Sequence, residues 1–205
     1  LNPLKAESIS TAVAGAVSDV QKSDIKLTIG TGRTLSLMRP YARALNVKLP
    51  VITTQGAVVA DPVSGQVFAE TLMPLKAARS VAAWVDKTRR TTVFYFTNPD
   101  ASVTIYQNQM AGDNDFYDHV FGNPRLHSPT LSTLLVEDNQ LPPVKFITIN
   151  DANTEPDITP DLTAQFPQLT ITRTHAQLVE GTARGINKGE GLRKLCELLD
   201  IDRKH

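Results

Sequence analysis

The chain has little that would tie it to nucleic acid, to a membrane or to a disulfide-stabilised fold. Its 205 residues include a single cysteine, Cys196, which excludes an internal disulfide and a zinc site built from cysteines. The 21 Lys and Arg residues balance 21 Asp and Glu residues, so no net positive charge attracts nucleic acid. Apolar runs such as residues 57–60 and 93–96 are far too short to cross a bilayer, and residues 1–5 lack the layout of a secretion signal. We therefore expect a globular, cytoplasmic protein without nucleic-acid or membrane partners.

Helix and strand patterns alternate along the first part of the chain. Apolar residues at helical spacing predict helices over residues 10–21 and 35–45. Alternating apolar and polar residues predict a strand over residues 25–29, and residues 50–54 form a second short strand pattern. Helices and strands that alternate at such short spacing are typical of a parallel sheet with crossover helices, which is an α/β fold.

The pattern changes after this part. A hairpin is predicted for residues 57–70, and a separate α+β unit is predicted from about residue 74 to 177. A last helix follows, with Leu192, Leu195, Cys196 and Leu199 on one face. Within the α+β unit we expect helices over 75–85 and 160–166, and strands over 91–97, 102–107, 145–149 and 169–173.

One short motif, Gly30-Thr31-Gly32-Arg33, has the chemistry of a phosphate-binding loop. It follows the predicted strand 25–29, and ligands of open α/β sheets bind at that end of the strands. The glycines let backbone amides approach an oxyanion, while the threonine adds a hydroxyl donor and the arginine a planar cation. An ordinary strand-to-helix turn explains the same four residues about equally well.

Two further motifs are compatible with the same ligand. Gly185-Ile186-Asn187-Lys188-Gly189 opens the last helix, where a lysine beside helix-terminal amides can neutralise a phosphoryl group. Gln55-Gly56-Ala57 ends the strand that begins at Pro50. Taken singly, the first fits a solvated lysine after a glycine turn, and the second fits a strand-terminating turn.

Together, and in this order, the three motifs resemble one family. The segments KLTIGTGRTLSLMRPYARALNV, PVITTQGAVVADPVSGQVFAETL and GINKGEGLRKLCELLDI are similar to the Cof-like phosphatases of the haloacid dehalogenase superfamily. The resemblance implies a Rossmann-like parallel-sheet core, incomplete in this chain, with an inserted α+β cap. It divides the chain into residues 1–73 (core), 74–177 (cap) and 178–205 (return to the core).

The resemblance also implies roles for individual residues. Thr31 would hydrogen bond a phosphoryl oxygen, and Lys188 would hold nucleophile and phosphoryl group together by its charge. Gly32 and Arg33 would complete the phosphate-binding loop. Gln55 stands where the family usually has asparagine, so its longer side chain would either reach the substrate or block the site.

Three more residues follow from the position of the last motif. Asn187 belongs to the N-K-G signature and is assigned to phosphate binding by the resemblance. Glu180 and Arg184 lie near the return to the core and are candidate substrate contacts, although a solvated surface role explains both.

The sequence lacks two motifs on which the family's chemistry depends. A D-x-D-G-T motif supplies the aspartate that attacks phosphorus and the aspartate that acts as general acid and base, and a G-D-x-x-N-D motif holds Mg²⁺. Neither occurs at the expected place, so the nucleophile and the ligands of the implied Mg²⁺ lie outside these residues. We therefore expect the sequence to be part of a longer chain or one half of a reconstituted assembly, with a degenerate stand-alone product as the less favoured alternative.

Three functions remain open at this point. The first is a Mg²⁺-dependent phosphatase that acts on sugar phosphates or other small phosphorylated metabolites through an aspartyl-phosphate. The second is a catalytically inactive module of the same fold that binds phosphate or a partner. The third is a sugar-phosphate mutase or a disaccharide-phosphate phosphatase with a related cap. The residues specify neither the substrate nor the oligomeric state.

Overall fold

The structure, a computed structural model, describes residues 9–23, 25–109, 115–138 and 141–202. The chain forms two compact units. The first consists of Leu1–Glu70, Asn98–Ser102 and Asn187–His205, and the second consists of Thr71–Thr97 and Val103–Ile186. The second unit thus includes residues 178–186, which the family resemblance assigned to the return segment.

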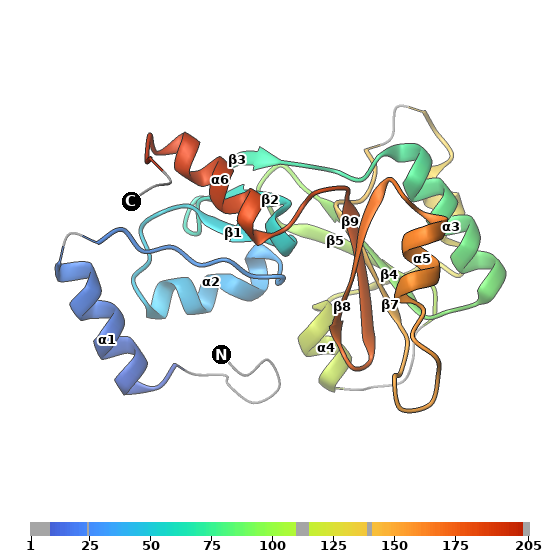
Figure 1. Cartoon of the computed structure of the whole chain (residues 1–205), viewed down its shortest axis with the longest axis horizontal. Coiled ribbons are helices and arrows are strands. Elements are labelled where there is room, and N and C mark those ends of the chain that lie inside the picture. Colours follow the sequence, from blue (N-terminus) through green and yellow to red (C-terminus); the bar gives the residue numbers. More distant parts are fainter. Residues whose placement is uncertain (1–8, 24, 110–114, 139–140, 203–205) are drawn as a thin grey trace. The chain divides into compact units, whose positions relative to one another are not determined.

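The first unit contains the elements that carry the glycine-containing motifs (Figure 1). Ser10 caps its first helix by accepting a hydrogen bond from the Val13 N–H at 3.3 Å, and both predicted helices in this part of the chain are confirmed. Its elements are α1 (Thr11–Lys22), α2 (Leu35–Ala44), β1 (Val51–Thr53), the 3₁₀ turn η1 (Thr54–Gly56), β2 (Val58–Ala60), β3 (Val67–Glu70) and α6 (Lys188–Leu198).

Strands β1, β2 and β3 form an antiparallel sheet, so the predicted hairpin is confirmed. Residues 25–29 do not form the predicted strand. One parallel bridge joins Gly30 to Ile52, supported by hydrogen bonds from the Ile52 N–H to the Ile29 carbonyl (2.8 Å) and from the Thr31 N–H to the Ile52 carbonyl (2.9 Å). A strand needs a run of such pairs, and the described residues supply only this short one.

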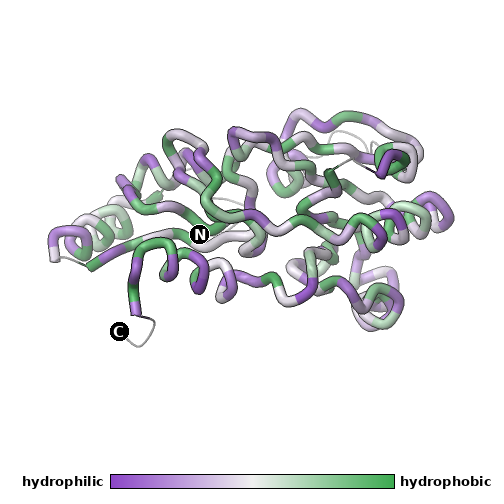
Figure 2. Tube along the Cα trace, turned by 90° about the horizontal axis from the view of Figure 1, so that it is seen from above, coloured by the Kyte–Doolittle hydropathy of each residue, from purple (hydrophilic) through white to green (hydrophobic). Residues whose placement is uncertain are grey.

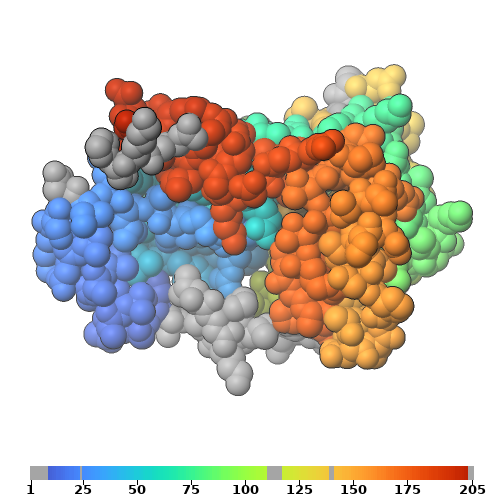
Figure 3. Space-filling view, in the orientation of Figure 1, coloured from blue at the N-terminus to red at the C-terminus, as the bar shows by residue number. Residues whose placement is uncertain are grey.

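Helix α6 packs against the three-stranded sheet through a small apolar cluster. Its Leu195 is buried with Ile52 and Val59, and Ala69 and Leu199 pack around them. In the space-filling view α6, in red, lies on the blue and cyan residues of the same unit (Figure 3). Leu192, predicted on the buried face, is 47 % exposed, because Gly191 and Leu195 face the sheet instead.

The second unit is built on a six-stranded sheet of order β6-β5-β4-β7-β9-β8. Its strands are β4 (Thr92–Thr97), β5 (Val103–Gln107), β6 (Leu126–His127), β7 (Lys145–Ile149), β8 (Leu169–His175) and β9 (Leu178–Ala183). Its helices are α3 (Leu75–Thr88), α4 (Asp115–Phe121), the 3₁₀ helix η2 (Leu131–Leu135) and α5 (Thr159–Gln165). Strand β9 lies between β7 and β8, so residues 178–183 belong to this sheet.

One face of this sheet carries the main hydrophobic core. Phe94, Phe146 and Val179 point to the same side and pack with apolar residues of α3 and α5. Hydrophobic and hydrophilic residues are interspersed along the trace of the chain in Figure 2. On the other face the Tyr95 hydroxyl donates a hydrogen bond of 3.0 Å to the Phe121 carbonyl, which ties α4 to the sheet.

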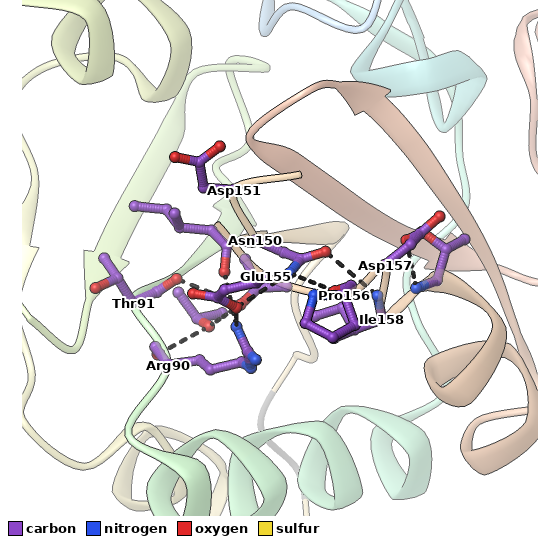
Figure 4. A network of polar contacts seen from close by, with 12 residues as sticks. Arg90, Thr91, Asn150, Asp151, Glu155, Pro156, Asp157 and Ile158 are labelled. Carbon is purple, nitrogen blue, oxygen red and sulfur yellow. Dashed lines mark hydrogen bonds and ion pairs between the residues drawn. The ribbon is translucent and has the colours of Figure 1, made fainter. Parts of the chain in front are cut away.

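A polar network fixes the loop that follows β7 (Figure 4). The buried Asn150 side chain donates to the Glu155 carboxylate (3.1 Å) and to the Pro156 carbonyl (3.0 Å), and it accepts from the Ile158 N–H (3.3 Å). Arg90 pairs with Glu155 at 2.5 Å. These contacts hold residues 151–158 against the ends of the central strands.

No helix within the described ranges is both long and apolar enough to cross a membrane.

Candidate phosphate-binding site

The Gly30–Arg33 loop is fixed in place by backbone hydrogen bonds to its neighbours in the first unit. The Arg33 N–H donates to the Thr31 hydroxyl oxygen at 3.1 Å, and the parallel bridge described above holds the start of the loop beside β1. Thr34 then begins α2 with extended backbone and without a side-chain cap. The loop therefore runs directly into a helix N-terminus, where backbone N–H groups favour an anion.

The turn Thr54–Gly56 is joined to this loop by two hydrogen bonds. The Thr54 N–H donates to the Arg33 carbonyl at 2.9 Å, and the Gln55 N–H donates to the Thr31 carbonyl at 3.2 Å. All three residues of the turn have positive φ angles, of 54°, 61° and 99°. Such a backbone is unfavourable for threonine and glutamine, and residues held in this way concentrate at functional sites.

The Gln55 side chain lies directly against Gly32. A Cβ atom at position 32 would be 2.4 Å from the Gln55 Nε2 atom, so the space that a side chain would need is taken by the amide of Gln55. Gln55 is thus adjacent to the Gly30–Arg33 loop.

Helix α6 begins beside the same turn. Asn187 is its N-cap, and its side-chain oxygen accepts from the Glu190 N–H at 3.0 Å. A Cβ atom at Gly56 would lie 2.0 Å from the Asn187 carbonyl oxygen and 3.0 Å from the Lys188 nitrogen. The absence of a side chain at Gly56 therefore lets Lys188, the first residue of α6, lie against the turn.

The charges at this start of α6 favour an anion. Lys188 is exposed to solvent, and the only described carboxylate in the first turn, Glu190, pairs with Arg193 at 2.6 Å. Hydrogen bonds from Arg193 to Glu190 and Glu197 raise the pKa of its guanidinium. The arginine thus balances the negative charge of Glu190. The positive charge of Lys188 and the N-terminus of the helix then both attract an anion.

Glu180 and Arg184 belong to the second unit. Glu180, in β9, is buried and pairs with the equally buried Lys145 at 3.0 Å, and it accepts from the Thr174 hydroxyl at 2.6 Å. The Lys145 ammonium also lies 4.7 Å from the centre of the Tyr95 ring. Arg184 is exposed, and its backbone N–H bonds the Gln168 carbonyl.

Burial and the nearby Glu180 charge raise the pKa of the Tyr95 hydroxyl. Both effects oppose a second negative charge on this face of the sheet. The Lys145–Glu180 pair is therefore already compensated within the second unit, and it needs no ligand to balance it.

No group of three or more His, Cys, Asp or Glu side chains suited to a metal ion occurs among the described residues. Six of the predicted site residues lie around one turn, and none of them has a carboxylate side chain: Thr31, Gly32, Arg33, Gln55, Asn187 and Lys188. The arrangement brings a threonine hydroxyl, two amide side chains and two cationic side chains to the neighbourhood of this turn.

The sequence patterns missed a residue that contacts the loop. Tyr41, in the second turn of α2, places its ring 5.0 Å from the guanidinium carbon of Arg33. An aromatic residue eight positions after an arginine carries no sequence signal of contact. The contact joins the end of the loop to the second turn of the helix that follows it.

Comparisons with known proteins identify the family of the chain. A family model described as haloacid dehalogenase-like hydrolase matches residues 3–205. A search of curated proteins gave no match.

Several solved structures share the fold of this chain. A haloacid dehalogenase-like hydrolase from B. subtilis has a TM-score of 0.75 at 18% identity, with 95% of this chain and 74% of that chain covered. TM0651 from Thermotoga maritima has a TM-score of 0.72 at 18% identity, covering 94% and 69%. The subclass IIB sugar phosphatase BT4131 has a TM-score of 0.70 at 18% identity, covering 96% and 71%. These likenesses confirm the predicted fold class, and the match of the family model over nearly the whole chain shows that it belongs to the haloacid dehalogenase-like hydrolases.

Proposed function

We propose that this chain binds the phosphoryl group of a small phosphorylated metabolite, such as a sugar phosphate, and contributes this site to a phosphatase. The observation that carries the proposal is the joining of three segments distant in sequence at the turn Thr54–Gly56. Two backbone hydrogen bonds tie the turn to Thr31 and Arg33, and the close approach of Gly56 and Asn187 ties it to the start of α6. The fold is shared with BT4131, which is itself a sugar phosphatase.

Each residue has a defined task in this proposal. The Thr31 oxygen accepts from the Arg33 N–H, so its own hydrogen is left to donate to a phosphoryl oxygen. The Arg33 guanidinium donates through its planar fork, and Lys188 adds a point charge at a helix N-terminus. Asn187 contributes by fixing the first turn of α6, because its side-chain oxygen caps that helix.

The complete reaction would pass through an aspartyl-phosphate and would depend on Mg²⁺, as phosphotransferases of this superfamily generally do. The described residues do not fit a metal ion, since no suitable group of ligands occurs among them. The proposal therefore assigns to these residues only the binding, orientation and charge neutralisation of the phosphoryl group. The attacking carboxylate is assigned to none of them.

A second candidate is a module that binds phosphate without turning it over. It is favoured by the same lack of a metal-binding group, and by the glutamine at position 55 where asparagine is usual. The two candidates share the binding site and differ in whether phosphate is released.

The test uses the 205-residue chain and two probes, inorganic phosphate and glucose 6-phosphate. Calorimetric titration is expected to show binding that is lost in Lys188→Ala and in Thr31→Val. Lys194→Ala is the matched control, because this lysine lies on the same helix but away from its first turn, and its binding should equal that of the parent chain.

Phosphate release from glucose 6-phosphate, with and without Mg²⁺, separates the two candidates. We expect the 205-residue chain to bind and not to release phosphate. Mg²⁺-dependent release that disappears in Lys188→Ala would show that this chain is itself the enzyme. Absence of binding to both probes would refute the proposed site.

A further inference from the structure

A hollow of about 580 Å³ lies in the second unit, where the chain passes from α3 into β4. A volume of this size is typical of sites for small molecules. We call it the arginine hollow, and its walls are formed by Thr88, Arg89, Arg90, Thr91, Ile149 and Glu155. None of these residues belongs to the candidate phosphate-binding site, whose members are all in the first unit.

The guanidinium of Arg90 is held in the wall of the arginine hollow. Its Nη1 atom donates to the Glu155 carboxylate at 2.5 Å and to the Ile149 carbonyl at 3.4 Å, and both of these residues also line the hollow. Asn150 donates to the same carboxylate at 3.1 Å, so the partner of Arg90 is itself fixed (Figure 4). The charged group of Arg90 therefore lies among the lining residues.

The other edge of this guanidinium is open to a ligand. Its Nε–H and Nη2–H groups make no hydrogen bond to any residue that the structure describes, and neither nitrogen is among the fully buried polar atoms without a partner. These two groups form the fork that donates two parallel hydrogen bonds to an oxyanion. Because Glu155 and Ile149 already hold the side chain, binding would cost little further side-chain entropy.

Arg89 adds a second positive charge to the arginine hollow. Its side chain is exposed and forms no hydrogen bond or ion pair with the described part of the chain. Its φ angle of 58° is left-handed, at a helix end where glycine is usual. The end of α3 is capped without either arginine side chain, because the Val85 carbonyl accepts from the Arg89 N–H and the Trp84 carbonyl accepts from the Thr88 hydroxyl.

The charges of the arginine hollow favour a ligand with a single negative charge. Two guanidinium groups and one carboxylate, that of Glu155, leave one net positive charge among the lining residues. Asp151 also acts on Glu155, although it does not line the hollow and its carboxylate points away from Arg90 (Figure 4). A phosphate monoester carries a charge of about −1.5 to −2 at neutral pH, and both carboxylates would repel the excess. A carboxylate carries one charge and matches the arginine fork.

We propose that the arginine hollow binds a small hydroxylated carboxylate. The Nε–H and Nη2–H groups of Arg90 bind its two carboxylate oxygens, and Arg89 adds a second positive charge. The oxygens of Glu155, Thr88 and Thr91 accept from its hydroxyl groups. This inference does not rest on the proposed function, because the two sites share no residue and differ in the anion that they bind.

The test is a calorimetric titration of the 205-residue chain with glucuronate. Glucose, which lacks the carboxylate, is the neutral control and should not bind. Glucuronate should bind equally well to the parent chain and to Lys188→Ala. Binding should also shift the NMR resonance of the Arg90 Nε–H group, which reports directly on the open edge of the guanidinium.

Three variants locate the bound carboxylate. Arg89→Ala should weaken glucuronate binding by about 3- to 10-fold, and this exposed residue is not needed for folding. Arg90→Lys keeps the charge but loses the fork, so it should weaken binding by about 10-fold or more. Lys87→Ala is the matched control, because it removes the same charge from an exposed neighbour that does not line the hollow, and it should bind like the parent chain.

Several results would overturn the inference. Absence of glucuronate binding is one, and binding that Arg89→Ala and Lys87→Ala weaken equally is another, since it would show diffuse attraction to positive charge. Loss of glucuronate binding in Lys188→Ala would place the carboxylate at the candidate phosphate-binding site. The proposed function is judged separately, by the binding of inorganic phosphate and its loss in Lys188→Ala, so either site can fail while the other stands.

Discussion

Gly56 and Asn187 lie so close together that a Cβ atom at position 56 would be 2.0 Å from the Asn187 carbonyl oxygen. No side chain fits at that separation, and the φ angle of Gly56, 99°, is one that other residues rarely adopt. The two residues are 131 positions apart in the sequence, the difference between 187 and 56. Their contact is what brings the Q-G-A and N-K-G motifs to one place.

Gly56→Ala is expected to lower the free energy of unfolding by about 2–4 kcal/mol, because it adds both a steric clash and a strained φ angle. It should also abolish phosphate binding, since the start of α6 must move. Urea denaturation and phosphate titration measure the two effects. Gly185→Ala is the control: Gly185 has a φ of 80° but open space around it, so only the strain of about 1 kcal/mol should appear. Equal losses in both variants would contradict the steric argument.

Gly32→Ala should change stability by less than about 1 kcal/mol, because the atom in the way is the flexible end of the Gln55 side chain. The amide of Gln55 is expected to be displaced, which the NMR resonances of its side-chain NH₂ group would show. In a Gln55→Ala background the same substitution should cost nothing. A cost that persists there would mean that Gln55 does not occupy the space beside Gly32.

Lys145→Met should destabilise the second unit by about 3–5 kcal/mol, because it leaves the buried Glu180 carboxylate without its partner. The double variant Lys145→Met/Glu180→Leu should recover most of this loss, since no buried charge is then left unpaired. Thermal and urea unfolding of the parent chain, the single variant and the double variant test the prediction. A double variant less stable than Lys145→Met alone would refute it.

Lowering the pH should destabilise the loop that follows β7, because the Glu155 carboxylate becomes protonated. Hydrogen bonds from Arg90 and Asn150 lower the pKa of the Glu155 carboxyl. A group whose pKa is lowered by folding stabilises the protein above its unfolded pKa, about 4.3 for glutamate, and this contribution is lost as the pH falls through the folded value. Because this carboxylate is 40% exposed, the contribution is under about 1 kcal/mol.

The measurement compares the urea midpoint of the parent chain with that of Glu155→Gln between pH 7 and pH 3. The parent chain should be the more stable at neutral pH, and the two curves should converge on acidification. A gap that is independent of pH would show that the ionised carboxylate does not stabilise the loop.

The elements with strong local patterns were predicted well. Apolar spacing in residues 75–85 identified α3, and the predicted strand 145–149 is β7 with the same bounds. The glycines of the three motifs marked the turns that gather at the site. These features depend on short stretches of chain, which a sequence shows directly.

The features that the sequence patterns did not predict depend on contacts between residues far apart in the chain. Strand β9 is buried along its whole length, yet its sequence includes a glutamate whose burial depends on Lys145 in the neighbouring strand. Residues 25–29 have a strand pattern, but Ile25 is 58 % exposed and the single bridge to β1 lies at Gly30, just after this segment. The position of Tyr41 over Arg33 likewise depends on how the loop enters α2. Propensity does not encode such partners.

The three successive left-handed residues of the turn Thr54–Gly56 lower the stability of the fold, while their arrangement supports the proposed phosphate binding. Glycine or asparagine would adopt the positive φ angles of positions 54 and 55 at a lower energy cost than threonine and glutamine do. A selection for thermostability alone is therefore expected to change these two positions early. Those changes would remove the amide that lies beside Gly32, or loosen the backbone to which the phosphate loop is bonded. Variants recovered from such a selection should therefore be more stable and bind phosphate less tightly. The loss of affinity would show that the native turn keeps its shape at the expense of stability.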